Sequence, residues 1–243
     1  MGSNTCGVIV GADCTQEWLL PWWWEKFSRW NDLPVAFIDF GLSKEMKSWC
    51  EQKGQRIRLL IAPTFVIEQE ELDPILAASW QKDYGTHIWP SRDAWFLKPL
   101  ACLQSPFETT LWIDLDCEIR APLHSLFAYS SNPTGLAMAL DVGSLQPPMY
   151  NSGVISFKKQ CKLIDQWAEA SFQRNHEFIG DQDLLSTLIA EQNLTIGLLP
   201  ATYNWSRYLP ENHEANILHW HGPWGKAIIR QQIARSLSKN IDT

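Results

Sequence analysis

The stretch TTLWIDLDCEIRAPL, residues 109–123, joins a run of apolar residues to a group of acids. The apolar residues 111–113 are typical of a buried strand, and Asp114 ends that strand. Asp116 follows two residues later. Because successive side chains of a strand alternate between its two faces, we expect Asp114 and Asp116 to point the same way.

Two carboxylates this close repel each other, and both stay ionised only where a cation or hydrogen-bond donors lie between them. Their hard oxygen atoms suit Mg²⁺ or Mn²⁺, which can bridge a diphosphate. The alternative is a solvated acidic loop that binds nothing, and the pair alone does not exclude it. Glu118 would share this face if the strand continued, but Pro122 indicates a turn, so we leave Glu118 out of the site.

The N-terminal part of the chain predicts a mostly parallel sheet. Residues 6–13, 33–43 and 55–63 have the pattern of buried strands, with helical stretches after the first and second. In such sheets ligands bind at the carboxyl ends of the strands. Asp13 and Asp39 stand at such ends, as Asp114 does.

The rest of the chain continues the alternation of strands and helices. The first helix starts late or breaks near Pro21, and Ser43 and Gly54 bound the second helix. A helix over 93–104 is interrupted by Pro99. The further predicted strands are 134–143 and 153–159, 195–205 is expected as a strand that runs into a loop, and 215–227 as another strand and loop. The further predicted helices are 73–85, 161–175, 181–193 and 228–240.

Composition bounds the class of protein. Hydrophobic residues make up 45% of 243, which is enough for one sizeable core, so we expect a single α/β domain over residues 1–243. The net charge of −7 and the absence of a basic stripe exclude a general nucleic-acid surface. No apolar run reaches the roughly 18 residues that a membrane span needs.

The cysteines and tryptophans leave alternatives open. The six cysteines are widely spaced without a C-x-x-C pair, which argues against a zinc knuckle. We recognise no signal peptide, so we expect reduced thiols and a cytoplasmic protein, although disulfides remain open. Most of the 14 tryptophans fit a core, whereas Trp220 and Trp224 fit a core or an acceptor platform equally well. The basic tail 228–240 allows, but supports only weakly, a membrane-surface role.

Five motifs in order along the chain carry a resemblance to a known family. They are LWIDLDCEI, MYNSGVISFKK, GDQDLLSTLI, LLPATYNW and ILHWHGPWGK, and with Lys98 they span residues 98–226. This order resembles the retaining glycosyltransferases of the family that includes glycogenin and the bacterial lipopolysaccharide galactosyl- and glucosyltransferases. The resemblance implies a GT-A fold, in which a Rossmann-like sheet flanked by helices carries a D-x-D strand end.

The resemblance implies a metal site and a diphosphate site. Asp114, Asp116 and His219 match the metal ligands, and two carboxylates with a neutral imidazole suit Mn²⁺, with Mg²⁺ as the alternative. His221 is a near neighbour, and we prefer His219 because Gly222 follows three residues later, as in the family. Lys226 matches a residue that neutralises the leaving diphosphate, one position later than the family spacing.

The resemblance also implies a site for the donor. Lys98 stands where the family places a basic residue near the diphosphate, and Asp13 and Asp39 match the positions that hold uridine. Asn151, Asp181 and Gln182 match the contacts to the donor sugar, with Asp181 and Gln182 nearest the reaction. We also expect Asp181 to cap the helix that it begins, because capping and sugar binding can coexist at one helix start.

The implied function is metal-dependent transfer of a hexose from a UDP-sugar to an acceptor hydroxyl, with retention of configuration. Residues 1–120 would form the nucleotide-binding half and 121–243 the donor-sugar and acceptor half. The acceptor would be a carbohydrate, a glycolipid or a protein. One alternative is a haloacid-dehalogenase-like phosphatase that uses the D-x-D aspartates, and another is a silent domain that binds nucleotide-sugars.

Overall fold

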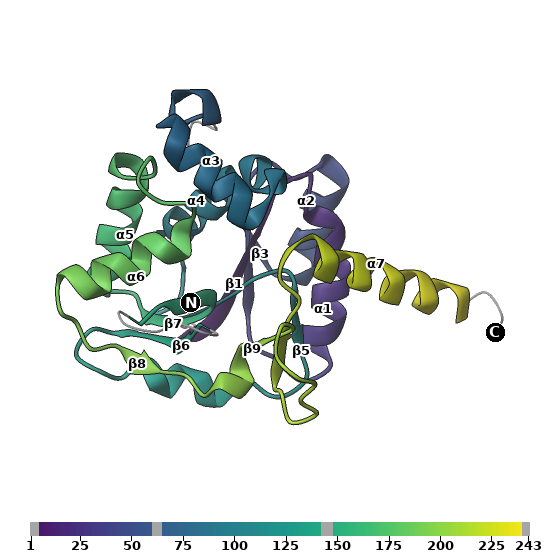
Figure 1. Ribbon diagram of the computed structural model, residues 1–243. Coiled ribbons are helices and arrows are strands. Elements are labelled where there is room, and N and C mark those ends of the chain that lie inside the picture. The colour runs from purple at the N-terminus through teal and green to yellow at the C-terminus, as the bar shows by residue number, and fades with distance from the viewer. Residues whose placement is uncertain (1–4, 60–64, 142–147, 240–243) are drawn as a thin grey trace.

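The computed structural model describes residues 5–59, 65–141 and 148–239. A seven-stranded sheet with the order β3-β2-β1-β4-β7-β6-β8 runs through the molecule (Figure 1). Its strands are β1 (Cys6–Ala12), β2 (Val35–Asp39), β3 (Gln55–Arg58), β4 (Thr109–Ile113), β6 (Leu136–Leu140), β7 (Tyr150–Lys158) and β8 (Gly197–Leu198). β3, β2, β1 and β4 are parallel to one another, and β7 is antiparallel to β4 and β6. The predicted mostly parallel sheet is therefore confirmed.

Helices cover both faces of this sheet (Figure 1). They are α1 (Leu20–Ser28), α2 (Lys44–Lys53), α3 (Pro74–Tyr84), α4 (Trp89–Leu103), α5 (Lys162–Gln173), α6 (Asp181–Glu191) and α7 (Gly222–Lys239). The 3-10 helices are η1 (Glu17–Leu19), η2 (Gln69–Glu71), η3 (Thr86–Ile88), η4 (His124–Ser130) and η5 (Ala201–Tyr203). Of the described helices, none is both long enough and apolar enough to cross a membrane.

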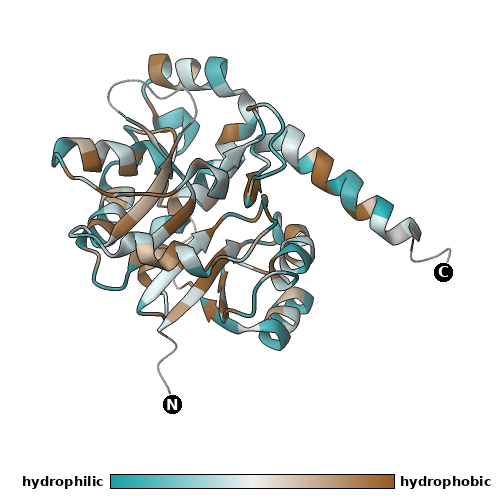
Figure 2. Ribbon diagram, turned by 90° about the horizontal axis from the view of Figure 1, so that it is seen from below, coloured by the Kyte–Doolittle hydropathy of each residue, from teal (hydrophilic) through white to brown (hydrophobic). Residues whose placement is uncertain are grey.

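Two cores lie on opposite faces of the sheet because strand side chains alternate. On β1, Val8 and Val10 pack with α1, α2 and η4, whereas Ile9 packs with α4, α5 and α6. On β4, Leu111 joins the first core and Trp112 the second. Hydrophobic residues accordingly concentrate in the strands and on the inner sides of the helices, as Figure 2 shows. Because both faces of the sheet are buried, its strands are the nearly continuous apolar runs seen in the sequence.

A second, three-stranded sheet stands beside the first, with the order β5-β10-β9. It consists of β5 (Cys117–Ile119), β9 (Trp205–Ser206) and β10 (Ile217–His219). β10 pairs antiparallel with β5, and this register places His219 opposite Cys117. The pairing therefore brings His219 next to the D-x-D motif.

Three details differ from the sequence-based expectations. α4 begins at Trp89 and continues through Pro99 without interruption, because it packs against β1, α5 and α6. α7 begins at Gly222 rather than near residue 228, and it projects from the body of the molecule (Figure 1 and Figure 2). Residues 195–205, expected as a strand that runs into a loop, contain the short β8, then η5 and the first residue of β9. The late start of α1 at Pro21 and the cap at Ser43 are confirmed.

Candidate metal and nucleotide-sugar site

The D-x-D motif forms a turn and not the continuous strand that the alternation argument assumed. β4 ends at Ile113, and the backbone N–H of Cys117 donates to the carbonyl oxygen of Asp114 across 3.1 Å. The expectation that strand geometry aligns Asp114 with Asp116 is therefore wrong. The chain turns here because it leaves the large sheet for β5 in the small one.

The two carboxylates nevertheless converge on the imidazole of His219. Its Nε2 atom lies 3.2 Å from Asp116 Oδ1 and 3.8 Å from Asp114 Oδ2. His221 stacks on this ring, with 3.7 Å between the ring centroids. In this arrangement His219, and not His221, faces the carboxylates. The three residues predicted as metal ligands are thus brought together.

Asp116 lies in a strongly charged environment although it is only 9% exposed. Burial by itself would raise the pKa of Asp116, but the neighbouring His219 and Lys226 lower it, and the net pKa lies well below its ordinary value. Asp116 is therefore a carboxylate at neutral pH. Burial has the opposite consequence for His221, whose pKa falls to about 3, so that this ring is neutral.

The chemistry of the donor atoms fits a divalent cation. Among the described residues, Asp116, Cys117 and His219 place ligand atoms within 4.8 Å of one another. Burial raises the pKa of the Cys117 thiol well above its ordinary value, and the thiol donates to the carbonyl oxygen of Gly153. Cys117 therefore stays protonated, which leaves the two carboxylates and one imidazole nitrogen. That set suits Mn²⁺ or Mg²⁺.

Lys98 joins this cluster to the start of α6. Its ammonium group, buried in α4, lies 3.1 Å from Asp114 Oδ1, 3.1 Å from Asp181 Oδ2 and 3.1 Å from Ser152 Oγ. Burial by itself would lower the pKa of Lys98, but Asp114 and Asp181 raise it by more. The net pKa is therefore raised, and the side chain is a cation. The pKa of Asp181 is raised, chiefly by burial and partly offset by Lys98.

Asp181 does not cap α6, so the expectation that it would also act as a cap is wrong. The N-cap residue is Gly180, and no side chain caps the helix there. The Asp181 carboxylate instead accepts from Ser152 Oγ across 2.8 Å and pairs with Lys98. The residue consequently faces the cluster and not its own helix terminus.

Gln182 and Asn151 share one carboxylate that the sequence analysis missed. Gln182 Nε2 donates to Asp141 Oδ2 across 2.8 Å, and Asn151 Nδ2 donates to Asp141 Oδ1 across 3.1 Å. β6 runs in the same direction as β4, since both are antiparallel to β7, and Asp141 directly follows β6. The rule of acids at strand ends, applied to residues 134–143, would have found Asp141. Ser152 and Asn204 were also missed, although both stand inside the quoted motifs.

Asp13 and Asp39 lie at the ends of the neighbouring strands β1 and β2, where Ala12 is the register partner of Asp39. The Asp13 carboxylate accepts from the backbone N–H groups of Thr15 and Gln16, each across 2.9 Å. Asp39 is buried and forms an ion pair with Arg56 at 3.0 Å. Both acids thus shape their loops, and a contact with uridine stays a prediction.

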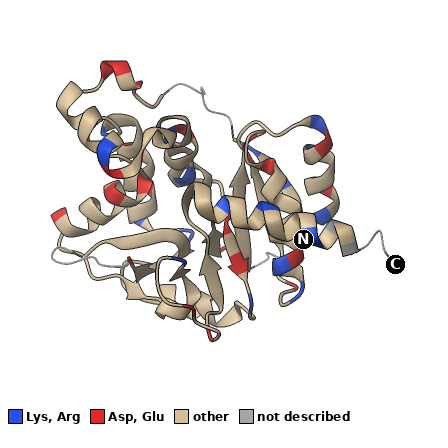
Figure 3. Cartoon of the chain, turned by 45° about the vertical axis from the view of Figure 1, so that its right-hand side comes forward, with Lys and Arg blue, Asp and Glu red and all other residues tan. Residues whose placement is uncertain are grey.

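The segment after β10 carries the remaining predicted residues. Gly222 has a φ of 70°, which favours glycine, and it begins α7. Trp220 donates from Nε1 to Glu118 Oε2 across 3.0 Å, so Trp220 and Glu118 satisfy each other. Trp224 is 76% exposed. Lys226 is followed along α7 by other basic residues and no acidic ones, which Figure 3 shows as blue segments.

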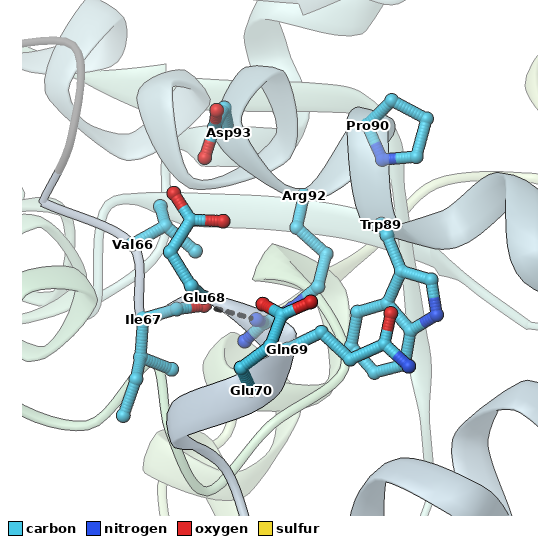
Figure 4. A pocket seen from close by; sticks show the side chains of 9 residues that line it. All are labelled: Val66, Ile67, Glu68, Gln69, Glu70, Trp89, Pro90, Arg92 and Asp93. Carbon is cyan, nitrogen blue, oxygen red and sulfur yellow. Dashed lines mark hydrogen bonds between the residues drawn. The ribbon is translucent and has the colours of Figure 1, made fainter.

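A separate pocket of about 240 Å³ contains none of the predicted site residues. Its lining includes Glu68, Glu70, Asp93 and the buried Arg92 (Figure 4). Arg92 reaches the carbonyl oxygen of Ile67 across 3.0 Å, and its other hydrogen bonds also go to backbone carbonyls. The arginine is thus engaged in holding the backbone together.

No protein-family model and no curated protein sequence matches the chain. Solved structures do share its fold. The galactosyltransferase LgtC, solved with donor and acceptor sugar analogues, matches with a TM-score of 0.61 and 12% identity over 89% of this chain and 87% of LgtC. Mouse xyloside xylosyltransferase 1 in its apo form matches with a TM-score of 0.55 and 17% identity over 88% of this chain and 96% of the mouse protein. The glycosyltransferase GlyE of Streptococcus pneumoniae gives a TM-score of 0.61 and 15% identity over 96% of this chain and 64% of GlyE.

The chain therefore has the GT-A fold of these glycosyltransferases. This finding confirms the predicted fold class and supports the resemblance that the five motifs indicate.

Proposed function

We propose that this chain is a metal-dependent glycosyltransferase that moves a hexose from a UDP-sugar to an acceptor hydroxyl. The observation that carries the proposal is the convergence of Asp114, Asp116 and His219 at the carboxyl edge of a GT-A sheet. Lys98 and Gln182 line the same edge, so groups for a diphosphate and for a sugar stand side by side. In open α/β sheets this edge is where ligands bind.

The metal would be Mn²⁺ or Mg²⁺, held by Asp114, Asp116 and His219. When bound, it would draw charge from the diphosphate and help UDP to leave. Lys226 lies close enough to lower the pKa of Asp116, and a mobile lysine suits the diphosphate leaving group. Lys98 would act from the opposite side, next to Asp114.

The nucleotide-binding half, residues 1–120, would hold uridine at Asp13 and Asp39. The half formed by residues 121–243 would bind the donor sugar through Asn151, Asp181 and Gln182, with Gly222 leaving room near the diphosphate. Amide and carboxylate groups can each make paired hydrogen bonds to sugar hydroxyls. The acceptor would be a carbohydrate, a glycolipid or a protein.

Retention of configuration would follow from a front-face reaction. The Gln182 carbonyl oxygen accepts from the backbone N–H of Ser152 across 3.1 Å, and its amide nitrogen donates to Asp141. An amide held at both ends is a poor nucleophile. The departing phosphate oxygen would therefore take the proton of the acceptor hydroxyl while that hydroxyl attacks the oxocarbenium-like sugar on the same face.

The decisive experiment is a screen of UDP-sugars for metal-dependent release of UDP, repeated with Asp116→Asn. Losing a partner outside the metal shell costs about 10–100-fold, so losing this ligand should reduce UDP release by more than about 100-fold. Asp165→Asn, an exposed acid on α5, is the matched control and should keep full activity. Full activity of Asp116→Asn would overturn the assignment.

Two outcomes of the screen separate the alternatives. A chain that binds UDP and Mn²⁺ but releases no UDP from any UDP-sugar would be a silent nucleotide-sugar-binding domain. Strong turnover of p-nitrophenyl phosphate with Mg²⁺ would instead indicate a phosphatase.

A further inference from the structure

His219 has two ring nitrogens with different surroundings. Nδ1 lies 2.9 Å from Asn204 Oδ1, and Nε2 lies 3.2 Å from Asp116 Oδ1. A neutral imidazole carries its hydrogen on one nitrogen only, and only the other can bind a metal. The hydrogen-bond partners of Nδ1 therefore decide whether Nε2 is available as a ligand.

The orientation of the Asn151 amide is fixed by groups other than His219. The backbone N–H of Gly153 donates to Asn151 Oδ1 across 2.9 Å, and a backbone N–H can only donate. The amide nitrogen of Asn151 must then point the other way, toward the carboxylate of Asp141 at 3.1 Å. An ionised carboxylate can only accept, so the hydrogen bonds of the amide oxygen and of the amide nitrogen indicate the same orientation.

The orientation of Asn151 in turn fixes the orientation of the Asn204 amide. Its Nδ2 donates to Asn151 Oδ1 across 2.8 Å and to the backbone oxygen of Asn151 across 3.4 Å. Both of these partners are acceptors, so the carbonyl oxygen of Asn204 must face His219. Asn151, Asn204 and His219 are 5%, 7% and 4% exposed, so bulk water has little access to the chain of bonds.

We propose that Asn204 is a positioning residue that keeps a hydrogen on Nδ1 of His219. The carbonyl oxygen of Asn204 can only accept, so Nδ1 donates to it, and Nε2, which faces Asp114 and Asp116, is the nitrogen left for a metal. Asn204 thereby prepares His219 as a metal ligand before any metal arrives. The link to metal binding rests on the proposed function, whereas the position of the hydrogen does not.

The position of the hydrogen can be measured without metal or activity. In the metal-free protein, ¹⁵N chemical shifts of the histidine rings should show a hydrogen on Nδ1 of His219. His219→Gln identifies the signal by its loss. Asn204→Leu should produce a mixture of both tautomers and lower the affinity for Mn²⁺ alone, measured by calorimetry, by about 10–100-fold.

Two further variants separate positioning from a general loss of structure. Asn204→Asp keeps an oxygen at Nδ1 and should retain the Nδ1 hydrogen. Asn31→Leu removes another buried amide, which bonds to the backbone N–H of Leu123, and should leave the His219 signals and the Mn²⁺ affinity unchanged.

Three results would overturn the proposal: a bare Nδ1 in the unmodified protein, a folded Asn204→Leu with unchanged tautomer and Mn²⁺ affinity, or equal changes in Asn31→Leu. A protein with the hydrogen on Nδ1 that binds no Mn²⁺ would support the tautomer assignment and overturn the metal site of the proposed function.

Discussion

Gly153 sets how closely β7 approaches the metal-ligand candidates. Its backbone N–H orients Asn151, and its carbonyl oxygen accepts from the N–H of Asp114 across 2.8 Å. A β-carbon at this position would overlap the ring of His219. The His219 ring therefore occupies the space that a side chain at position 153 would need.

We expect Gly153→Ala to weaken Mn²⁺ binding and to destabilise the protein by about 1–3 kcal/mol, the usual cost of overpacking. Calorimetric titration with Mn²⁺ and urea denaturation measure the two effects. Gly135→Ala is the control. Gly135 has a φ of 71° and directly precedes β6, at the end of that strand away from Asp141. It should lose about 1–2 kcal/mol of stability from backbone strain and bind Mn²⁺ normally. Normal Mn²⁺ affinity in Gly153→Ala would contradict the packing argument.

The surroundings of Asp183 raise the pKa of its carboxyl group. Burial, and then the neighbouring Asp181, raise the pKa of Asp183 from 3.8 to about 6. Between these two values the folded protein binds more protons than the unfolded chain. The contribution of Asp183 to stability therefore falls as the pH rises from about 4 to about 6 and stays low above that range.

Asp183→Asn should remove this dependence on pH. The free energy of unfolding of the variant, relative to the unmodified protein, should increase from pH 4 to pH 6 and then level off. Urea denaturation at half-unit steps between pH 4 and pH 7.5 measures the difference. A difference that stays constant across this range would show that Asp183 titrates alike in the folded and unfolded states.

At the scale of elements, α4 is held in place by Arg92, a buried cation that forms no ion pair with a carboxylate of the described residues. Arg92 donates to the carbonyl oxygens of Ile67, Asn175, Phe178 and Ile179, the first before η2 and the others between α5 and α6. Burial lowers the pKa of Arg92 to about 10, which still leaves it charged at neutral pH. Lys98 stands on the same helix, so this attachment also fixes the cation of the site.

Arg92→Met should reduce the free energy of unfolding by about 3 kcal/mol or more, because it leaves several buried carbonyls without donors. Arg174→Met is an instructive comparison. Arg174 forms ion pairs with Glu177 and Glu191, but these pairs are exposed, so the loss should be about 1 kcal/mol or less. Denaturant titration of both variants tests the order, and a larger loss in Arg174→Met would contradict it.

The elements that the sequence predicted well are those whose pattern is local. β1, β2 and β4 are apolar runs that end in an acid, and α2 has its cap at Ser43 and its end at Gly54. The errors have non-local causes. Pro99 does not interrupt α4 because packing on the sheet outweighs its lost hydrogen bond. The D-x-D turn arises because β5 pairs with β10, which lies far along the chain.

For the molecule as a whole, the site combines residues from distant segments. The motifs identified Asp116, Asn151, Gln182 and His219, and the structure brings all of them to one edge of the sheet. Asp141 was missed although it directly follows β6, where the rule of acids at strand ends would have found it. Contacts such as Asn204 with His219 depend on the register of three strands, which no local pattern encodes.

The three-residue strand β5 also bears on how the chain is made. Within the described sheets its only strand neighbour is β10, which is synthesised after everything from η4 to β9. Until β10 emerges from the ribosome, the backbone groups of β5 and the apolar Ile119 have no partner strand, and unpaired edges of this kind promote aggregation. The β5–β10 pairing beside the D-x-D turn therefore forms only after nearly the whole chain has been synthesised.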